Sequence, residues 1–372
     1  MQKTLLTLAL TGAMLSLSAH ATDVDIYGVL DTGFSIQNRD YVNSPTTTTT
    51  AMKSGQYMGS RFGIKGTEDL GNGLKVGFSL ENGFSSDSGH LSQNGRLFGR
   101  DARLFLEGER FGLLSVGRMG PIVGGNGPYA RFGRAMSPFS CGWGDVGGTL
   151  QVLSLGYDYI DNAIAYTTPK FGNVDASVQY SFGTDTTKYG TGREGSSSVE
   201  RTYSAALRYQ DDTFMVTGGI ESINPAQPAA RANQLDDAYS YNLGASYKAS
   251  FGKFYAYGQY FENYAAASKT TTFTIPSGID GWGALLSYEM PVKGGHLFAS
   301  VGYGDFKGSQ AKELTMKTTQ TAVGYLYSLS RRTTLYVGGD WIKVNYSDAY
   351  EVAHPKAVEN IYELIFGVAH KF

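Results

Sequence analysis

Apolar side chains recur at every second position in several segments of this chain, and this period restricts its fold more than any other feature. The chain ends ELIFGVAHKF, and the alternate apolar positions counted back from its end are Phe372, Val368, Phe366, Leu364 and Tyr362, with only His370 interrupting them. The same alternation runs through residues 24–34, 174–182 and 334–341. Successive side chains of a strand point to opposite faces, so these segments predict strands with one apolar face and one small or polar face.

The N-terminus has the features of an export signal. Lys3 supplies a positive charge, residues 5–17 are apolar, and Ala19-His20-Ala21 is a small-residue cleavage site. The apolar stretch is too short for a membrane anchor, and no later apolar run approaches the length of a membrane helix. We therefore expect a signal peptide at residues 1–21 and a mature chain of residues 22–372.

Composition excludes several other classes of protein. Cys141 is the only cysteine, so no intramolecular disulfide can stabilise this exported chain. The formal net charge is -2, which gives no indication of a nucleic-acid partner. With 49 glycines, 26 tyrosines and 20 phenylalanines against 10 prolines, the composition favours strands and tight turns over helices.

The connections between the predicted strands alternate between short and long. Short turns are expected at residues 69–73, 109–112, 170–173, 210–212, 250–252, 291–295 and 330–332. Long polar loops are expected at about 37–52, 85–99, 119–155, 184–199, 222–238, 264–279, 307–316 and 346–360. The threonine run 46–50 falls in the first of these loops and is interpreted as a flexible tip. Seven short and eight long connections join sixteen strands.

An even strand number, with short turns at one end and long loops at the other, is typical of an outer-membrane barrel. A soluble β-sandwich also alternates, but it does not explain the short-long rhythm. In a membrane barrel the apolar face contacts lipid, the polar face lines the lumen, and closure pairs every backbone group. The sequence thus predicts an all-β protein, a 16-stranded antiparallel transmembrane β-barrel.

Several motifs resemble the trimeric general-diffusion porins of Gram-negative bacteria. They are SRFGIKGTEDLGNGLKVGFSLENGF at 60–84, LFGRDARLFL at 97–106, SVGRM at 115–119, DNAIAYTTPKFGNVDASVQYSFG at 161–183, the opening VDIYGVLDTGF, and the terminal Phe372. The resemblance implies an outer-membrane homotrimer that passes small hydrophilic solutes and ions passively and needs no cofactor. It also implies that Phe372 is a signal for the outer-membrane assembly machinery, and that the third long loop, about 119–155, folds into the pore as a constriction.

A constriction of this kind acts through fixed charges around a water-filled opening. The motifs place Arg61 and Arg100 on the barrel wall, and Lys65 shares the face of Arg61 by alternation. Arg103 and Arg100 compete for the inward position unless a β-bulge intervenes, and Arg118 is a further candidate. The third loop contributes Arg131, Arg134 and a single acid, Asp145, whereas family members carry several acids there. Tyr159 stands where relatives commonly carry an arginine. This excess of positive charge predicts a preference for anions.

Two other functions compete with that of a general-diffusion channel. A substrate-specific channel would carry an aromatic track along the lumen, for which Tyr27, Tyr255 and Tyr257 are candidates, although each could equally belong to an interfacial belt. An enzyme would need catalytic residues. The chain has no G-x-S-x-G elbow, H-E-x-x-H zinc helix or phosphate-binding glycine loop, so neither catalytic nor metal-binding residues are predicted. Surface adhesion through the long loops could coexist with transport.

Overall fold

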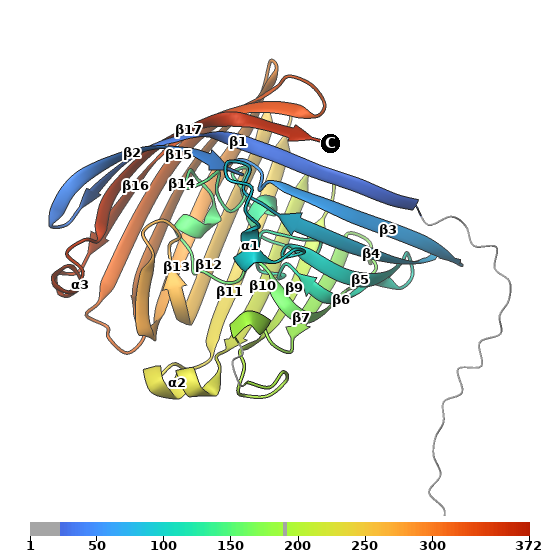
Figure 1. Ribbon diagram of the computed structural model, residues 1–372, viewed down its shortest axis with the longest axis horizontal. Helices are drawn as coiled ribbons and strands as arrows, with labels where there is room; N and C mark the ends of the chain where they lie inside the picture. Colours follow the sequence, from blue (N-terminus) through green and yellow to red (C-terminus); the bar gives the residue numbers. More distant parts are fainter. Residues whose placement is uncertain (1–22, 189–191) are drawn as a thin grey trace, which may run out of the picture.

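The strands of the protein form one closed antiparallel barrel (Figure 1). The computed structural model describes residues 23–188 and 192–372, so the predicted signal peptide lies outside the described residues. The strands are β1 (Asp23–Tyr41), β2 (Ser44–Ser54), β3 (Arg61–Gly71), β4 (Leu74–Gly83), β5 (Asp101–Gly108), β6 (Gly112–Met119), β7 (Ile160–Thr167), β8 (Val174–Ser181), β9 (Arg201–Gln210), β10 (Phe214–Asn224), β11 (Ala238–Ala249), β12 (Gly252–Ala267), β13 (Phe273–Val292), β14 (Gly295–Gly308), β15 (Thr315–Ser328), β16 (Thr333–Tyr346) and β17 (Val358–Lys371).

In the part of the chain that the structure describes, the connections contain only short helices. They are α1 (Ser92–Gly95), α2 (Gln227–Asn233) and α3 (Asp348–Ala353), with the 3-10 turns η1 (Gly133–Ala135), η2 (Thr149–Gln151) and η3 (Thr186–Lys188). Within residues 23–188 and 192–372, no helix has the length and apolar character needed to cross a membrane.

The seventeen strand segments make sixteen positions in the wall. β2 pairs with β1 from Thr32 to Tyr41, and β3 pairs with the same strand from Asp23 to Val29. β2 and β3 therefore occupy one wall position, interrupted by residues 55–60. Counting them as one strand reduces the seventeen segments to sixteen strands. β17 pairs with β1 from Val29↔Lys371 to Tyr41↔Val358 and closes the ring. The predicted 16-stranded antiparallel barrel is confirmed.

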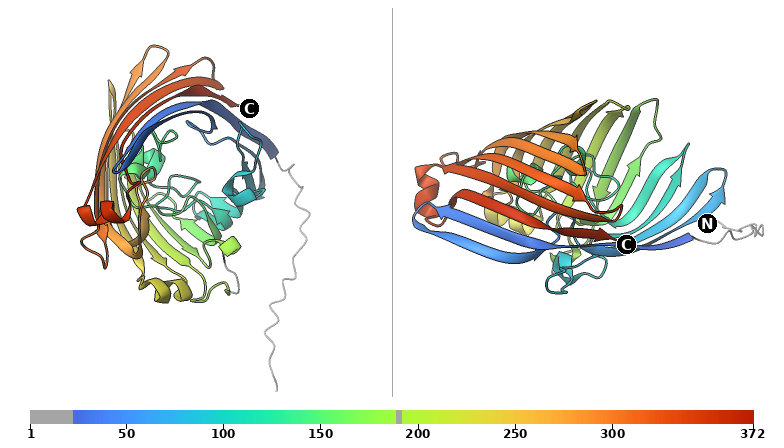
Figure 2. Two further views of the ribbon diagram at one scale, coloured as in Figure 1. Left: turned by 60° about the vertical axis from the view of Figure 1, so that its left-hand side comes forward. Right: turned by 90° about the horizontal axis from the view of Figure 1, so that it is seen from above.

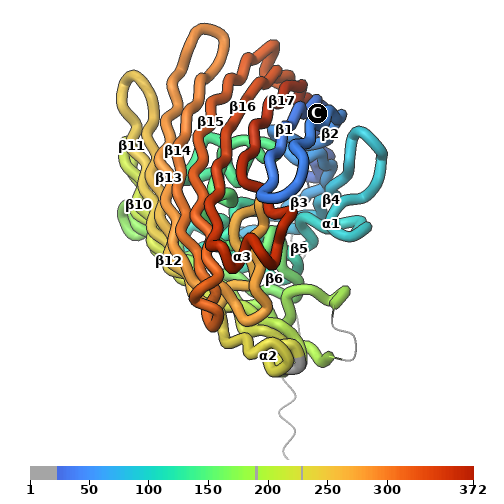
Figure 3. Tube along the Cα trace, turned by 90° about the vertical axis from the view of Figure 1, so that its left-hand side faces the viewer, coloured from blue at the N-terminus to red at the C-terminus, as the bar shows by residue number. Residues whose placement is uncertain are grey.

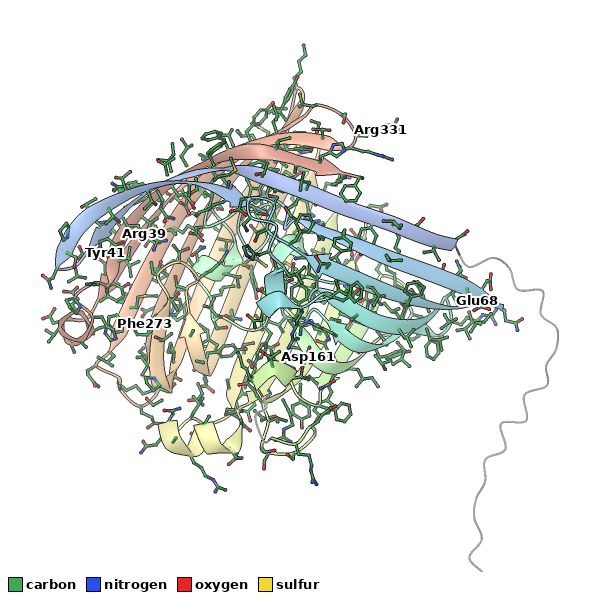
Figure 4. All side chains as sticks on the ribbon, in the orientation of Figure 1. Arg39, Tyr41, Glu68, Asp161, Phe273 and Arg331 are labelled. Atoms are coloured by element: carbon green, nitrogen blue, oxygen red, sulfur yellow. The ribbon has the colours of Figure 1, made fainter. Side chains whose placement is uncertain are left out.

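All seven predicted short turns are confirmed at one end of the barrel. They connect β3–β4, β5–β6, β7–β8, β9–β10, β11–β12, β13–β14 and β15–β16. The same end carries the start of β1 and the C-terminus (Figure 2). In outer-membrane barrels this is the periplasmic end. Figure 4 shows Glu68 and Arg331 there, and Arg39, Tyr41 and Phe273 toward the opposite, extracellular end.

Two of the eight predicted long loops are wrong. The first, 37–52, is a hairpin in which only residues 42–43 join β1 to β2, so the threonine run 46–50 is strand and not a flexible tip. Threonine is β-branched and suits a strand, and this hairpin gains side-chain bonds such as Asn38 Nδ2 to Thr48 Oγ1 at 2.9 Å. The sixth, 264–279, is also mostly strand, because β12 runs to Ala267 and β13 begins at Phe273.

The outer face of the wall carries the apolar side chains that the alternation predicted. Ile26 is 72 % exposed and Val178 is 52 % exposed, whereas Ser177 on the inner face is 1 % exposed. Stacked aromatic pairs mark the two membrane interfaces. These pairs are Phe214–Tyr247 and Phe254–Tyr288 toward the periplasmic end, and Tyr241–Tyr260 and Trp341–Tyr362 toward the extracellular end.

The inner face is not polar throughout, contrary to expectation. An apolar cluster fills it near the extracellular end, on the side of the long strands β10 to β17, which Figure 3 shows as tall neighbours. The cluster includes Phe261, Phe306, Ile342, Ile361 and Tyr350 of α3. The outer connections fold inward here, so the inner face contacts protein and not water.

The seam of the barrel depends on a close backbone approach at the last residue. Phe372 N donates to Gly28 O and Gly28 N donates to Phe372 O, both at 3.1 Å. The Phe372 ring lies over Gly28, where a Cβ would come within 2.2 Å of Phe372 Cζ. Glycine at this position therefore lets the terminal ring cover the seam.

We expect Gly28→Val to weaken the closed barrel, because its side chain would displace the Phe372 ring. The measurement is the temperature at which the folded, SDS-resistant band converts to the unfolded band on an unheated gel. Gly258→Val is the control, since the nearest atom to a Cβ at Gly258 lies 3.9 Å away. Equal conversion temperatures for the two variants would contradict this role of Gly28.

Candidate functional site, the pore constriction

The connection between β6 and β7, residues 120–159, packs against the inner wall of the barrel; we call it loop 3. Phe132 stacks on Tyr257 of β12 with ring centroids 5.2 Å apart. Phe139 and Trp143 meet Phe298 of β14 edge-on, at 5.9 and 5.3 Å. Figure 2 shows this segment running inside the ring of strands.

Glycines on the inner wall leave room for the side chains and backbone of loop 3; we call these positions its seats. A Cβ would lie 2.8 Å from Phe132 at Gly219, 2.3 Å from Met136 at Gly244, 1.7 Å from the Val152 carbonyl at Gly283, and 2.8 Å from Phe139 at Gly324. Each seat is on a different strand of the long-strand side. The missing side chains allow the loop to lie flat against the wall.

The tip of the β12–β13 hairpin, residues 268–272, binds the second half of loop 3. Leu155 N donates to Ala266 O at 2.9 Å, and Ser268 N donates to Leu153 O at 3.0 Å. Lys269 also donates from its side chain to Gly144 O at 2.9 Å. The sequence interpretation treated this segment as an ordinary outer loop and missed its part in the site.

Arg61 and Arg100 converge on one carboxylate. The distances from their Nε atoms to Glu81 oxygens are 3.4 Å and 2.6 Å, and Tyr27 donates to the same carboxylate at 3.0 Å. Two guanidinium groups therefore share one negative charge. Arg100 also lies over the ring of Tyr159, 5.3 Å from its centroid. The two wall arginines assigned from the motifs lie together.

Both competing arginines near β5 face inward. Arg103 bonds Asp101 at 3.0 Å and the Ser115 hydroxyl at 3.0 Å. The β4–β5 pairing is continuous from Leu74↔Gly108 to Glu81↔Asp101, without a bulge. Arg100 directly precedes β5, so its side chain is not bound by the alternation of that strand.

The remaining wall candidates have separate surroundings. Lys65 pairs with Asp25 at 3.5 Å, nearer the periplasmic turn, and both side chains are largely exposed. Arg118 pairs with Asp161, which Arg96 also contacts at 2.7 Å. Neither Lys65 nor Arg118 joins the pair at Glu81, although the Tyr159 ring lies between Arg100 and Arg118, 5.7 Å from the latter.

The three charged candidates of loop 3 differ in burial and pairing. Arg131 is buried and bonds Asp175 at 3.2 Å and Ser177 at 2.7 Å, so it fastens the loop to β8. Asp145 accepts a bond from Gln37 at 3.2 Å and lies 3.9 Å from Arg39. Arg134 is exposed and has no ion pair within the described part of the chain. Arg134 is thus the loop cation left for the lumen.

Two groups near the Arg61–Arg100 pair depart from the expected pattern. Asp158 is exposed and interacts electrostatically with Arg100, and it was missed because loop 3 continues four residues beyond the predicted end at 155. Tyr159 stands where the resemblance led us to expect an arginine, and burial raises the pKa of its hydroxyl, which therefore stays uncharged. Arg134 interacts electrostatically with Arg61, so the group contains three cations, Arg61, Arg100 and Arg134, against two anions, Glu81 and Asp158.

The three tyrosines of the candidate aromatic track point inward, but their hydroxyls already donate hydrogen bonds to neighbouring side chains. Tyr255 donates to Glu289 at 2.7 Å and Tyr257 donates to Asn242 at 2.7 Å, while Tyr27 bonds Glu81 as above. Phe132 covers Tyr257. The interpretation of these tyrosines as an interfacial belt is wrong. Within the residues that the structure describes, no cluster of three His, Cys, Asp or Glu side chains is arranged for a metal ion.

A closed sixteen-stranded barrel with an apolar exterior and a charged interior defines a transmembrane diffusion channel. The profile of the Gram-negative porin family matches residues 6–346, and the chain belongs to this family. It is an outer-membrane porin, through which small hydrophilic solutes and ions diffuse passively. Family and fold point to a channel and not to an enzyme.

Individual relatives agree with this assignment. The chain is 29% identical to an outer membrane porin protein of Bordetella pertussis, over 92% of this chain and 94% of that one. It is 27% identical to the major outer membrane protein P.IB of Neisseria meningitidis serogroup B over the full length of both. The solved structure of the anion-selective porin from Comamonas acidovorans superposes with a TM-score of 0.71 at 24% identity, covering 95% of this chain and all of that one.

We expect Gly283→Ala to displace loop 3 and raise the single-channel conductance, because its Cβ would meet the Val152 carbonyl at 1.7 Å. Conductance in planar bilayers is the measurement. Gly218→Ala is the matched control, since a Cβ there meets nothing within 4 Å. Unchanged conductance in a folded Gly283→Ala channel would show that this contact does not hold the loop.

Proposed function

We propose that loop 3 forms the pore constriction and that this porin conducts anions in preference to cations. The observation that carries the proposal is the pair Arg61 and Arg100 sharing Glu81, with Arg134 unpaired on the facing loop. Fixed charges beside a narrow aqueous opening raise the local concentration of ions of opposite sign. Three cations against Glu81 and Asp158 leave a net charge of +1.

The other candidate charges contribute less to selectivity under this proposal. Arg103, Arg118 and Arg131 each have a carboxylate partner, and Asp145 lies between Arg39 and Lys269. Lys65 acts near the periplasmic exit. The Comamonas acidovorans porin is described as anion-selective, so the property is compatible with this architecture. A substrate-specific channel is less favoured, because the inward tyrosines are bonded to neighbouring side chains.

We expect Arg134→Gln to lower the chloride-to-potassium permeability ratio by roughly two-fold, since it removes an exposed charge at the constriction without breaking an ion pair. Reversal potentials in a KCl gradient give the ratio. Arg231→Gln in α2 is the control, because it removes the same charge from an outer connection. A cation preference in the unmodified channel would refute the proposal.

We further propose that the porin is a homotrimer, supported by an unsatisfied strand edge. β2 pairs with β1 and, within the described residues, with no strand on its other edge. Met52 and Thr50 stand opposite Phe34 and Ile36, two lipid-facing residues of β1. Backbone groups at this depth need partners other than lipid, and a neighbouring copy of the chain supplies a protein surface.

An apolar groove beside this edge gives the proposed interface its side-chain contacts. The groove has a volume of about 580 Å³ and passes between strands β1, β2, β15, β16 and β17. Its outward side chains include Phe34, Met52, Leu335, Val337 and Phe366. The start and end of the barrel sheet would then lie at the subunit contact. In the same assembly pathway, we propose that residues 1–21 are removed on export and that Phe372 is read by the assembly machinery.

We expect Met52→Glu to reduce the trimer fraction, because it places a charge in the apolar groove. Leu243→Glu is the control for a charge on the outer wall, since Leu243 of β11 is exposed far from this groove. Detergent-corrected mass by light scattering distinguishes one from three chains. Trimer loss in both variants, or in neither, would contradict the proposed interface.

A further inference from the structure

A second cavity lies between loop 3 and the periplasmic end of the barrel wall. It has a volume of about 750 Å³ and is lined from above by Arg134, Ser137, Pro138 and Trp143 of loop 3. Its sides are the inner faces of β12 to β17 near their short turns, including Tyr255, Leu326 and Lys371. We call this cavity the exit chamber, because a solute passing Arg134 toward the periplasm enters it.

The exit chamber is lined by three cationic side chains and one acidic side chain. Arg134, Arg331 and Lys371 line it, all three are exposed, and none forms an ion pair within residues 23–188 and 192–372. The one acid in the lining, Glu289, already accepts a bond from Tyr255 at 2.7 Å and lies 3.0 Å from His296. A small anion would find three free cationic groups here. Figure 4 shows Arg331 at the periplasmic end.

The same chamber has an apolar and aromatic side. Tyr57, Pro138 and Leu326 are partly exposed in its lining, and behind them Trp143 meets Phe298 edge-on at 5.3 Å. Ligand sites of 300–1,000 Å³ typically combine such apolar surfaces with a few charged groups. A hydrated inorganic ion uses only the charges, whereas a flat ring with a carboxylate uses both kinds of surface.

We propose that the exit chamber is a low-affinity site for small aromatic carboxylates. The carboxylate pairs with Arg331 and Lys371, and the ring lies against the side formed by Tyr57, Pro138 and Leu326. Arg134 serves both the constriction and the chamber, so an anion leaving Arg61 and Arg100 meets Arg134 and then the other cations of the chamber. The inference rests on the proposed anion preference and names a class of anion that the channel retains.

Benzoate is the probe that tests the site in the full-length channel in planar bilayers. We expect benzoate added on the periplasmic side to reduce the chloride current with a saturable dependence on concentration. Acetate, which has the charge without the ring, and benzyl alcohol, which has the ring without the charge, should have little effect at the same concentration. Equal effects of benzoate and acetate, or a linear dependence, would overturn the site.

Arg331→Gln and Arg332→Gln form a matched pair of variants in one exposed turn, because only Arg331 lines the chamber. We expect Arg331→Gln to raise the half-blocking benzoate concentration about two- to fivefold, the range for one exposed ionic contact, and Arg332→Gln to leave it unchanged. Identical values for both variants would overturn the assignment. Reversal potentials in the same membranes separate the two proposals: a cation preference refutes the anion-selective function, whereas anion preference without benzoate saturation refutes only the exit chamber.

Discussion

The pairing of every backbone amide and carbonyl within the wall is the constraint on which the rest of the structure depends. Lipid offers no hydrogen bonds, so a sheet in the membrane has to close on itself. Here closure occurs between β1 and β17, and the final bonds join Gly28 to Phe372. The free edge of β2 lies beside an apolar groove, and the same constraint favours a protein neighbour there. Because the chain has a single cysteine, it can form no intramolecular disulfide. Closure of the barrel stabilises it instead, as disulfides do in many exported proteins.

Much of this architecture is predictable from local pattern. The two-residue period identified the outward side chains of β1, β8, β16 and β17, and the turn residues located all seven short connections. The errors arose where another interaction outweighed a local rule. The threonine run looked like a loop because it is polar, but β-branching and bonds across the hairpin keep it extended. Residues 264–279 looked like a loop because no lipid-facing pattern continues there, yet their apolar side chains pack inward on protein.

The charged site was predictable by residue type but not by role. Arg61 and Arg100 were identified together, and the structure joins them through Glu81, an acid that no loop-based search would include. Arg131 and Arg134 are three residues apart and look equivalent in the sequence, yet one is fastened to Asp175 and the other is exposed. Whether a loop arginine has an acidic partner depends on which strand of the barrel lies opposite it. The wall glycines against which loop 3 packs could be identified from the sequence. Glycine at inward positions of neighbouring strands indicates where another segment approaches the backbone.

The junction between the β12–β13 tip and loop 3 has a consequence for how this protein can diverge. Surface connections usually tolerate insertions and substitutions because they contact little else. Residues 268–272 are different, since a change in their length would displace loop 3, which we propose as the constriction. Surface variation at the β12–β13 tip would therefore also alter the segment that we propose controls permeability. Changes in this surface tip and changes in the pore are therefore not independent of each other.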